Sequence, residues 1–301
     1  MLSRLAESFF WMGRYLERCE STTRLLVEHH QLMVQEQQVT ATQGSEVLLS
    51  ALALDGHAND AASLVGVVFG SETEPSTILG SLAAARNNAR SIRDAIPGDF
   101  FEALNKSYIE IIDHQPHPQF PGADLRNHIE RLAVISGVFE WVAPRDESFH
   151  FLQLGRSLER LDLTARLLTT RYEQWWPEQG PATMLRAVGG FNTFLRGRVP
   201  MTGDRVRTFL TIDATFPRSL VSSSQSAENS MRELSSLLGL RHDDVLRDIG
   251  LLRSQLEYSS SAISDEFVDE VVHSAMNAVS STSGKVRDRF FRPVGTIVWS
   301  H

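Results

Sequence analysis

Lysine and cysteine are both scarce in this 301-residue sequence. The one cysteine, Cys19, excludes an intramolecular disulfide and any zinc or iron–sulfur site built from cysteines. Because Lys106 and Lys285 are the only lysines, arginine supplies nearly all of the basic charge. The planar, weakly hydrated guanidinium of arginine can hold a carboxylate through two hydrogen bonds. This composition therefore favours structured ion pairs or anion pockets over a loosely solvated charged surface.

Long apolar runs are also missing. No stretch approaches the ~20 apolar residues that cross a bilayer. The amino terminus carries Arg4, Glu7 and Arg14 where a signal peptide has an unbroken apolar core, so we expect a cytoplasmic protein. The formal net charge of −8 argues against a general basic surface. We therefore expect neither nucleic acid nor a membrane as a partner.

Common catalytic and cofactor motifs are absent as well. The sequence has no P-loop, no dinucleotide-binding glycine pattern and no GxSxG elbow, and Cys19 takes a core position of a predicted helix. Glu147 with His150, and Glu270 with His273, have the spacing used by helical di-iron proteins, but such sites need further glutamates on two other helices. We expect no cofactor and no metal.

The pattern that is present is helical. Apolar residues recur every three or four positions over long stretches, and few segments alternate with period two. We expect an all-α fold, a single large helical bundle in which residues 1–301 form one domain; a boundary near residues 177–181 is the alternative. Ser76 is the expected cap of the fourth helix. The expected helices span residues 3–38, 45–54, 59–70, 77–96, 99–113, 125–142, 147–176, 181–196, 203–213, 217–238, 242–259 and 264–289.

One charged helical phrase occurs twice, as GRYLERCESTTRLL from residue 13 and as GRSLERLDLTARLL from residue 155. At 100° per residue, the apolar positions of the first copy form one arc that must face the core. Glu17, Glu20 and Arg24 lie at the edge of this arc beside Gly13, and Glu20 and Arg24 have the spacing of a helical ion pair.

The second copy places Glu159, Asp162 and Arg166 beside Gly155 in the same way. Small residues next to charges indicate a close contact between helices. We expect the two helices to pack around a pseudo-twofold axis, with the charged edge of one facing that of the other, so that the charges are shared between helices.

A further basic cluster lies in ARNNARSIRDAI, where Arg86, Arg90 and Arg93 fall on one helix face. Three stacked arginines repel each other unless acids or a bound anion neutralise them. We consider the acids of the repeated phrases candidates for this role, and a solvated basic face is the alternative.

Four segments, LSRLAESFFWMGRYLERCESTTRLL, ARNNARSIRDAI, LGRSLERLDLTARLL and FPRS, resemble in that order the marks of the bacterial alpha-E proteins, a helical family of unknown function. The resemblance extends from about residue 1 to about residue 290. It implies two partners, a circularly permuted ATP-grasp ligase and a transglutaminase-like protein, in a system that makes or modifies peptides. It points to Glu7, Trp11, Arg14, Glu17, Arg18, Glu20, Arg24, Arg86, Asn88, Arg90, Arg93, Gly155, Arg156, Glu159, Arg160, Asp162, Arg166 and, more weakly, Arg218 as site residues.

Three functional hypotheses follow from these observations. The first is a non-catalytic helical partner of the ligase, whose Glu/Arg-lined groove holds a peptide, an anionic intermediate or the partner protein. The second is an enzyme of peptide synthesis or modification, in which a groove carboxylate acts as general base or metal ligand. The third is a scaffold whose charges only fix helix packing.

Overall fold

The computed structural model describes residues 3–36, 39–240, 244–259 and 263–291. This part of the chain contains helices and no strand, which confirms the predicted all-α fold. The first half contains α1 (Ser3–Gln35), α2 (Ala41–Leu52), α3 (Ala61–Phe69), α4 (Ile78–Ser91), a 3-10 turn (Arg93–Ala95), α5 (Gly98–Asp113) and α6 (Gly122–Val142). The second contains α7 (Glu147–Thr169), α8 (Tyr172–Trp175), α9 (Gly180–Ala187), α10 (Phe191–Arg196), α11 (Gly203–Ile212), α12 (Leu220–Leu237), α13 (Val245–Glu257), α14 (Asp265–Val286) and a π-helical turn (Arg287–Phe291).

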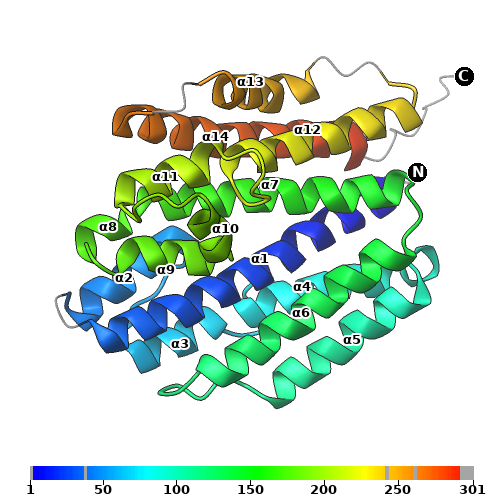
Figure 1. Cartoon of the computed structure of the whole chain (residues 1–301). Coiled ribbons are helices and arrows are strands. Elements are labelled where there is room, and N and C mark those ends of the chain that lie inside the picture. Colours follow the sequence, from blue (N-terminus) through cyan, green and yellow to red (C-terminus); the bar gives the residue numbers. More distant parts are fainter. Residues whose placement is uncertain (1–2, 37–38, 241–243, 260–262, 292–301) are drawn as a thin grey trace, which may run out of the picture.

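Two long helices, α1 and α7, pack against each other at the centre of the molecule (Figure 1). Helices α4, α5 and α6 cover one side of this pair, and α12, α13 and α14 cover the other. The shorter helices α8 to α11 lie together near one end of α7. The buried apolar side chains form one continuous cluster that runs through both sides.

The two sides are copies of one arrangement. α4 packs on α1 as α12 packs on α7, and α6 packs on α1 as α14 packs on α7. Ile78 begins α4 and Leu220 begins α12, a separation of 142 positions that also relates Gly13 to Gly155. The duplication recognised in the charged phrase therefore extends over most of the chain.

Helix α4 begins one residue later than the sequence predicts. The side chain of Thr77, not that of Ser76, accepts the hydrogen bond from Gly80 N and caps the helix. Ser219, 142 positions later, caps α12 in the same way by accepting from Ser222 N. The prediction of Ser76 was wrong because serine and threonine are both good caps and the sequence offers them in succession.

Two predicted helices are interrupted. The one predicted for residues 147–176 breaks at Arg171, whose φ of 48° lies in the left-handed region, and the one predicted for residues 181–196 breaks at Gly189, whose φ is 71°. The predicted residues 37–38 of the first helix and 242–243 of another lie outside the described residues.

The contact between α1 and α7 is made backbone against backbone. A Cβ atom added to Gly13 would lie 2.1 Å from the carbonyl oxygen of Leu152, and one added to Gly155 would lie 2.1 Å from that of Phe10. These reciprocal distances show the pseudo-twofold relation that the repeated phrase predicts. Because only glycine fits at such a crossing, the two helices approach closely enough for the arginines of one to reach the glutamates of the other.

Candidate functional site

Glu17 lies at the centre of the α1–α7 contact and has no exposed surface. Arg160 of α7 donates to both of its oxygens, from Nε at 3.0 Å and from Nη2 at 2.7 Å. The Nε of Arg156, one turn earlier on α7, lies 3.5 Å from Glu17 Oε2. The carboxylate of α1 is therefore held by two guanidinium groups of α7.

Glu159, the equivalent residue of α7, is held by α1 in return. Arg14 Nε and Arg18 Nε each donate to one of its oxygens at 2.5 Å. Arg14 also donates from Nη1 to Ser283 Oγ of α14 at 2.9 Å, which ties the network to the outer layer. The charges of the two copies are thus shared reciprocally across the helix contact.

The helical ion pair predicted between Glu20 and Arg24 is confirmed at 3.0 Å, and Arg166 pairs with Asp162 in the same way at 2.9 Å. Arg24 and Arg166 therefore do not share their charges across the contact, as the facing of the two charged edges suggested. The crossing pairs use arginines nearer to the glycine, where the helix axes are closest. The helical projection identified the right faces, but it could not give the distance of each side chain from the crossing point.

Arg218 joins the network from the turn that precedes α12. Its Nη1 donates to Glu17 Oε1 at 2.5 Å and its Nη2 to Glu20 Oε1 at 2.9 Å. Nη1 also donates to Ser21 Oγ at 2.8 Å. One guanidinium thereby bridges two carboxylates that lie one helical turn apart on α1.

The arginines keep both central carboxylates ionised. Burial alone would raise the pKa of Glu17, but Arg160, Arg218 and Arg156 hold it well below its usual range. Burial likewise opposes ionisation of Glu159, and Arg14 and Arg18 lower its pKa. A carboxylate with a lowered pKa is a weak base at neutral pH, which counts against a general-base role for either residue.

Cations outnumber anions in this network, in which seven arginines face four carboxylates. The pKa of Arg218 is lowered by burial and by the neighbouring Arg160 and Arg24, against the opposite effect of Glu17 and Glu20. The arginines are Arg14, Arg18, Arg24, Arg156, Arg160, Arg166 and Arg218, and the carboxylates are Glu17, Glu20, Glu159 and Asp162.

Two cavities border the network between α1, α2 and α7. The larger, about 130 Å³, is lined by Arg18, Thr22, Leu52, Ala53, Ser76, Glu159, Asp162, Leu163 and Arg166. We call it the Ser76 cavity. The smaller, about 30 Å³, is lined by Ser21, Leu25, Ala51, Leu52, Leu163, Thr164, Leu167, Ala187, Val188 and Arg218. The groove predicted from the sequence is therefore largely filled by its own ion pairs, and the Ser76 cavity is its larger open part.

The remaining predicted residues of α1 are Trp11 and Glu7. Trp11 is half-buried and stacks on Tyr15, and the guanidinium of Arg14 lies 5.9 Å from the Trp11 ring. Glu7 lies one turn before Trp11 and is half-buried. Trp11 thus lies beside Arg14, one of the two arginines that reach Glu159.

The basic cluster is separate from the network, and its three arginines do not share one helix as predicted. Because α4 ends at Ser91, Arg93 lies in the 3-10 turn that follows, over the ring of Phe101. Arg86 of α4 donates to Asn105 of α5 at 2.8 Å and lies over the ring of Tyr108. Arg90 is exposed, and Asn88 donates to the Ala84 carbonyl. The acids of the repeated phrases do not neutralise this cluster as suggested, because arginines of α1, α7 and the turn before α12 already hold them.

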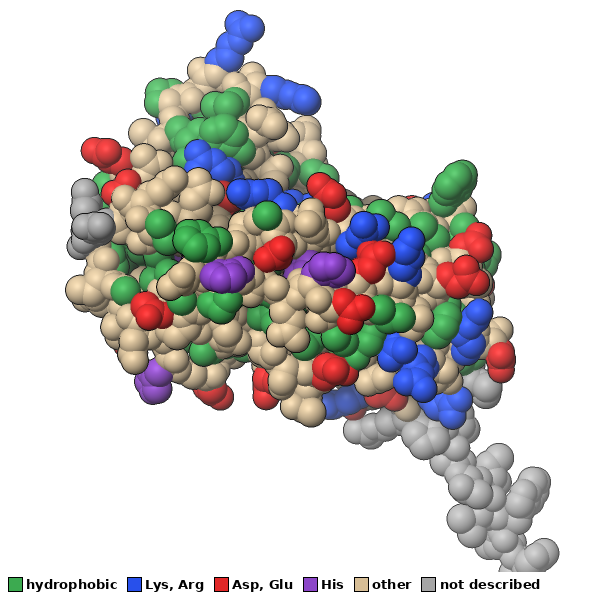
Figure 2. Space-filling model, turned by 90° about the horizontal axis from the view of Figure 1, so that it is seen from below, with side chains coloured by type: hydrophobic (Ala, Val, Ile, Leu, Met, Phe, Trp, Pro, Cys, Tyr) green, Lys and Arg blue, Asp and Glu red, His purple; other side chains and the backbone are tan. Residues whose placement is uncertain are grey.

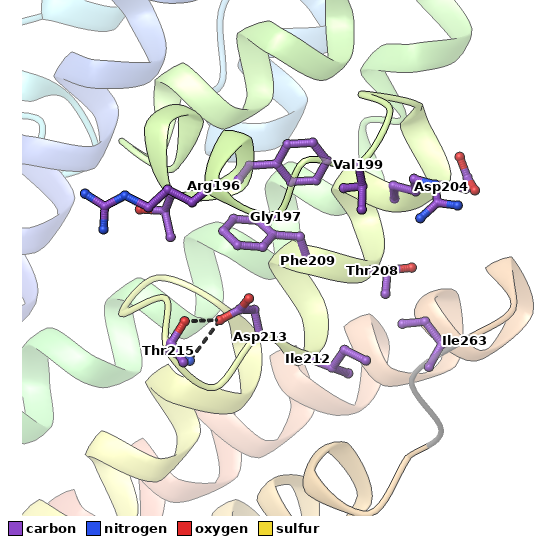
Figure 3. A pocket seen from close by; sticks show the side chains of 13 residues that line it. Arg196, Gly197, Val199, Asp204, Thr208, Phe209, Ile212, Asp213, Thr215 and Ile263 are labelled. Carbon is purple, nitrogen blue, oxygen red and sulfur yellow. Dashed lines mark hydrogen bonds between the residues drawn. The ribbon is translucent and has the colours of Figure 1, made fainter.

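A larger cavity of about 800 Å³ lies away from the network between α10 and α11 (Figure 3). Apolar side chains such as Val199, Phe209 and Ile212 line it, with Arg196 and Asp204 at its rim. Asp213 accepts hydrogen bonds from the backbone and hydroxyl of Thr215 there. No motif in the sequence pointed to this cavity.

A second cluster of ion pairs lies around the buried Arg207, which pairs with Glu173, Asp265 and Asp269. On the face shown in Figure 2, acidic and basic side chains are interspersed among apolar ones. Nowhere in the described ranges do three or more His, Cys, Asp or Glu side chains gather as metal ligands would. No described helix is both long and apolar enough to cross a membrane.

The fold and the site together define a class of protein: an all-α chain, duplicated about a pseudo-twofold axis, with a Glu/Arg network at the contact of its two central helices. The chain belongs to the Alpha-E family, whose model, described as a predicted alpha-helical domain with a conserved ER motif, matches residues 1–291. Both copies of the repeated phrase contain Glu-Arg, at Glu17-Arg18 and at Glu159-Arg160. The family resemblance inferred from the sequence is confirmed.

Two curated relatives come from Mycobacterium bovis and Mycobacterium tuberculosis, and both are uncharacterized proteins. Each is 24% identical over 303 residues, an alignment that covers 84% of this chain and 34% of the relative. The chain thus spans about a third of the length of these relatives. No solved structure matches it.

Proposed function

We propose that this protein is a non-catalytic helical partner of an ATP-grasp peptide or amide ligase, and that its Glu/Arg network and the Ser76 cavity hold a peptide, an anionic intermediate or the partner protein. The observation that carries the proposal is the Ser76 cavity itself, which is continuous with the duplicated Glu/Arg network and is lined by both signs of charge.

A peptide suits such a lining. Asp162 and Glu159 offer acceptors, while Arg18 and Arg166, whose side chains are 23% and 33% exposed, offer donors. The network that surrounds these groups holds them in place, so binding costs little side-chain ordering. Polar groups positioned in this way give orientation and specificity to a ligand site.

The mycobacterial relatives support a role alongside other protein segments. In both, the segment that matches this chain is about a third of a longer protein. The ligase and the transglutaminase-like protein enter the proposal from the family resemblance.

We favour this role over an enzyme that uses the groove carboxylates. Glu17 and Glu159 are each occupied by arginines that lower their pKa. A general base or a metal ligand needs lone pairs free of such partners.

Co-purification with a circularly permuted ATP-grasp ligase from the same organism tests the proposal. We expect Arg166→Ala and Asp162→Ala to reduce association, or the ligase activity of the complex, at least tenfold. Arg232→Ala is the matched control. Like Arg166→Ala, it breaks an i,i+4 ion pair within one helix, here with Glu228 on α12, but Arg232 does not line the Ser76 cavity. Unchanged association and activity in folded Arg166→Ala and Asp162→Ala would contradict the proposal and leave the charges a purely structural role.

A further inference from the structure

The turns that precede α4 and α12 are equivalent in the duplicated fold, and they differ at one position. Pro75-Ser76-Thr77 leads into α4, and Pro217-Arg218-Ser219 leads into α12, 142 positions later. Thr77 and Ser219 are the two caps, which fixes the register of the comparison. Ser76 is therefore the counterpart of Arg218.

Hydrogen bonds at the two turns show what this difference changes. Thr164 Oγ1 donates to the carbonyl of Arg218 at 3.0 Å. Its counterpart Thr22, only 1% exposed, has a hydroxyl without a partner and lines the Ser76 cavity. A buried unpaired hydroxyl costs free energy unless a ligand or water satisfies it.

The carboxylates show the same asymmetry. Arg218 bridges Glu17 and Glu20 with its two Nη atoms. No side chain among the described residues bridges the counterparts Glu159 and Asp162, which are held separately by Arg18 and Arg166. Aspartate at position 162 is also one methylene shorter than glutamate at position 20. The space that a guanidinium fills on one side is the 130 Å³ Ser76 cavity on the other.

The number of arginines that hold the carboxylates also differs between the two sides. Glu17 and Glu20 are held by Arg24, Arg156, Arg160 and Arg218, whereas Glu159 and Asp162 are held by Arg14, Arg18 and Arg166. The Glu17 side shows that two carboxylates of this network can hold four guanidinium groups, one more than the Glu159 side holds.

We propose that the Ser76 cavity binds a guanidinium group, such as the arginine side chain of a peptide, between Asp162 and Glu159 in the position that Arg218 takes on the opposite side. Guanidinium fits because its planar fork can reach two carboxylates at once. Thr22 Oγ1 can accept a further hydrogen bond from it. This inference rests on the proposed function in that it names the group by which a peptide would be recognised.

Binding of N-acetyl-argininamide to the full-length protein, followed by NMR and calorimetry, tests the inference. N-acetyl-citrullinamide is the matched probe, since it has the same shape without the charge. We expect the arginine probe to bind at least tenfold more tightly than the citrulline probe. Equal binding of the two probes, or no binding of either, would overturn the inference, and so would inorganic phosphate displacing the arginine probe, because the site would then be an anion site.

Two variants test whether the probe binds in the Ser76 cavity. Ser76→Arg supplies the missing guanidinium from the chain and should abolish binding, while Ser50→Arg, at an exposed position of α2, should not. Asp162→Asn should weaken binding at least tenfold even if Ser76→Arg folds poorly. Binding that persists in both Ser76→Arg and Asp162→Asn would overturn the inference. Ligase association and activity that stay unchanged in Arg166→Ala and Asp162→Ala, together with probe binding at the Ser76 cavity, would instead contradict only the proposed function.

Discussion

Glu17 on α1 and Glu159 on α7 are equivalent residues of two duplicated helices, and each is held by two arginines of the other helix. The reciprocal distances at Gly13 and Gly155 show why this is possible. Where the backbones touch, arginines on either side span the contact. The network therefore depends on the helix crossing as much as on the charges.

Removing the carboxylate of Glu17 should destabilise the protein strongly. Glu17→Ala would leave Arg156, Arg160 and Arg218 facing each other without their shared anion, and breaking a buried pair of this kind costs about 3–5 kcal/mol. Urea unfolding measures the loss. Glu140→Ala, which removes an exposed partner of Arg145, should cost less than about 1 kcal/mol. Similar losses in the two variants would show that the buried network adds no more than a surface pair.

Methyl groups at the helix crossing should also be poorly tolerated. In Gly13→Ala or Gly155→Ala the new Cβ would lie 2.1 Å from a backbone carbonyl oxygen, so the helices must separate. We expect a loss of about 1–3 kcal/mol or more from overpacking. Gly66→Ala in α3 is the control, because its Cβ would meet nothing within 4 Å and alanine favours a helix by about 1 kcal/mol. An unchanged melting temperature in both crossing variants would refute the close contact.

Arg218→Ala should destabilise the protein, and added guanidinium ion should restore part of the lost stability. The variant removes the guanidinium that bridges Glu17 and Glu20, so its melting temperature should fall by several degrees. Low millimolar guanidinium chloride should restore part of this loss, while tetramethylammonium chloride at equal ionic strength should not. Equal effects of the two salts would indicate simple screening and contradict a specific guanidinium position.

The buried His29 should make stability depend on pH. Its Nε2 donates to the Gly44 carbonyl at 2.8 Å, so Nδ1 of the neutral ring accepts from Tyr172 Oη at 2.6 Å. Burial lowers its pKa to about 4. Between the unfolded pKa near 6.5 and the folded value, the unfolded chain binds the extra proton, so stability falls as the pH drops through this window. The loss from this one group should reach about 3 kcal/mol.

Urea unfolding at pH 7 and pH 4.5 measures this dependence. His29→Gln keeps a polar side chain but removes the titrating group, so the variant should lose less stability than the wild type between the two pH values. Glu17 and Glu159 affect stability at lower pH than His29 does. Because their pKa values are lowered in the folded protein, the stability that they contribute is present above the unfolded carboxyl pKa near 4.3 and is lost as the pH falls further. An identical pH dependence in His29→Gln and wild type would contradict a neutral buried His29.

The helices could largely be predicted from periodicity, and the predicted bounds that were wrong have local causes. Where the chain turned through a left-handed residue, as at Arg171, nothing in the apolar pattern marked the break. The constant separation of 142 positions was present in the sequence beyond the charged phrase, in Pro75-Ser76-Thr77 and Pro217-Arg218-Ser219. That signal marks Ser76 and Thr22 as site residues, although neither stands out in the charged pattern of its own segment.

The sequence by itself determined that the protein is helical, that one charged phrase is used twice, and that its glutamates lie at the edge of the core beside a glycine. These features are local, because they depend on helix periodicity and residue size. Only the tertiary structure decided that Arg160 and Arg156 hold Glu17, that Arg14 and Arg18 hold Glu159, and that Arg218 reaches across to Glu17. The physical reason is that ion pairing depends on distances from the helix crossing, which a projection of one helix does not contain.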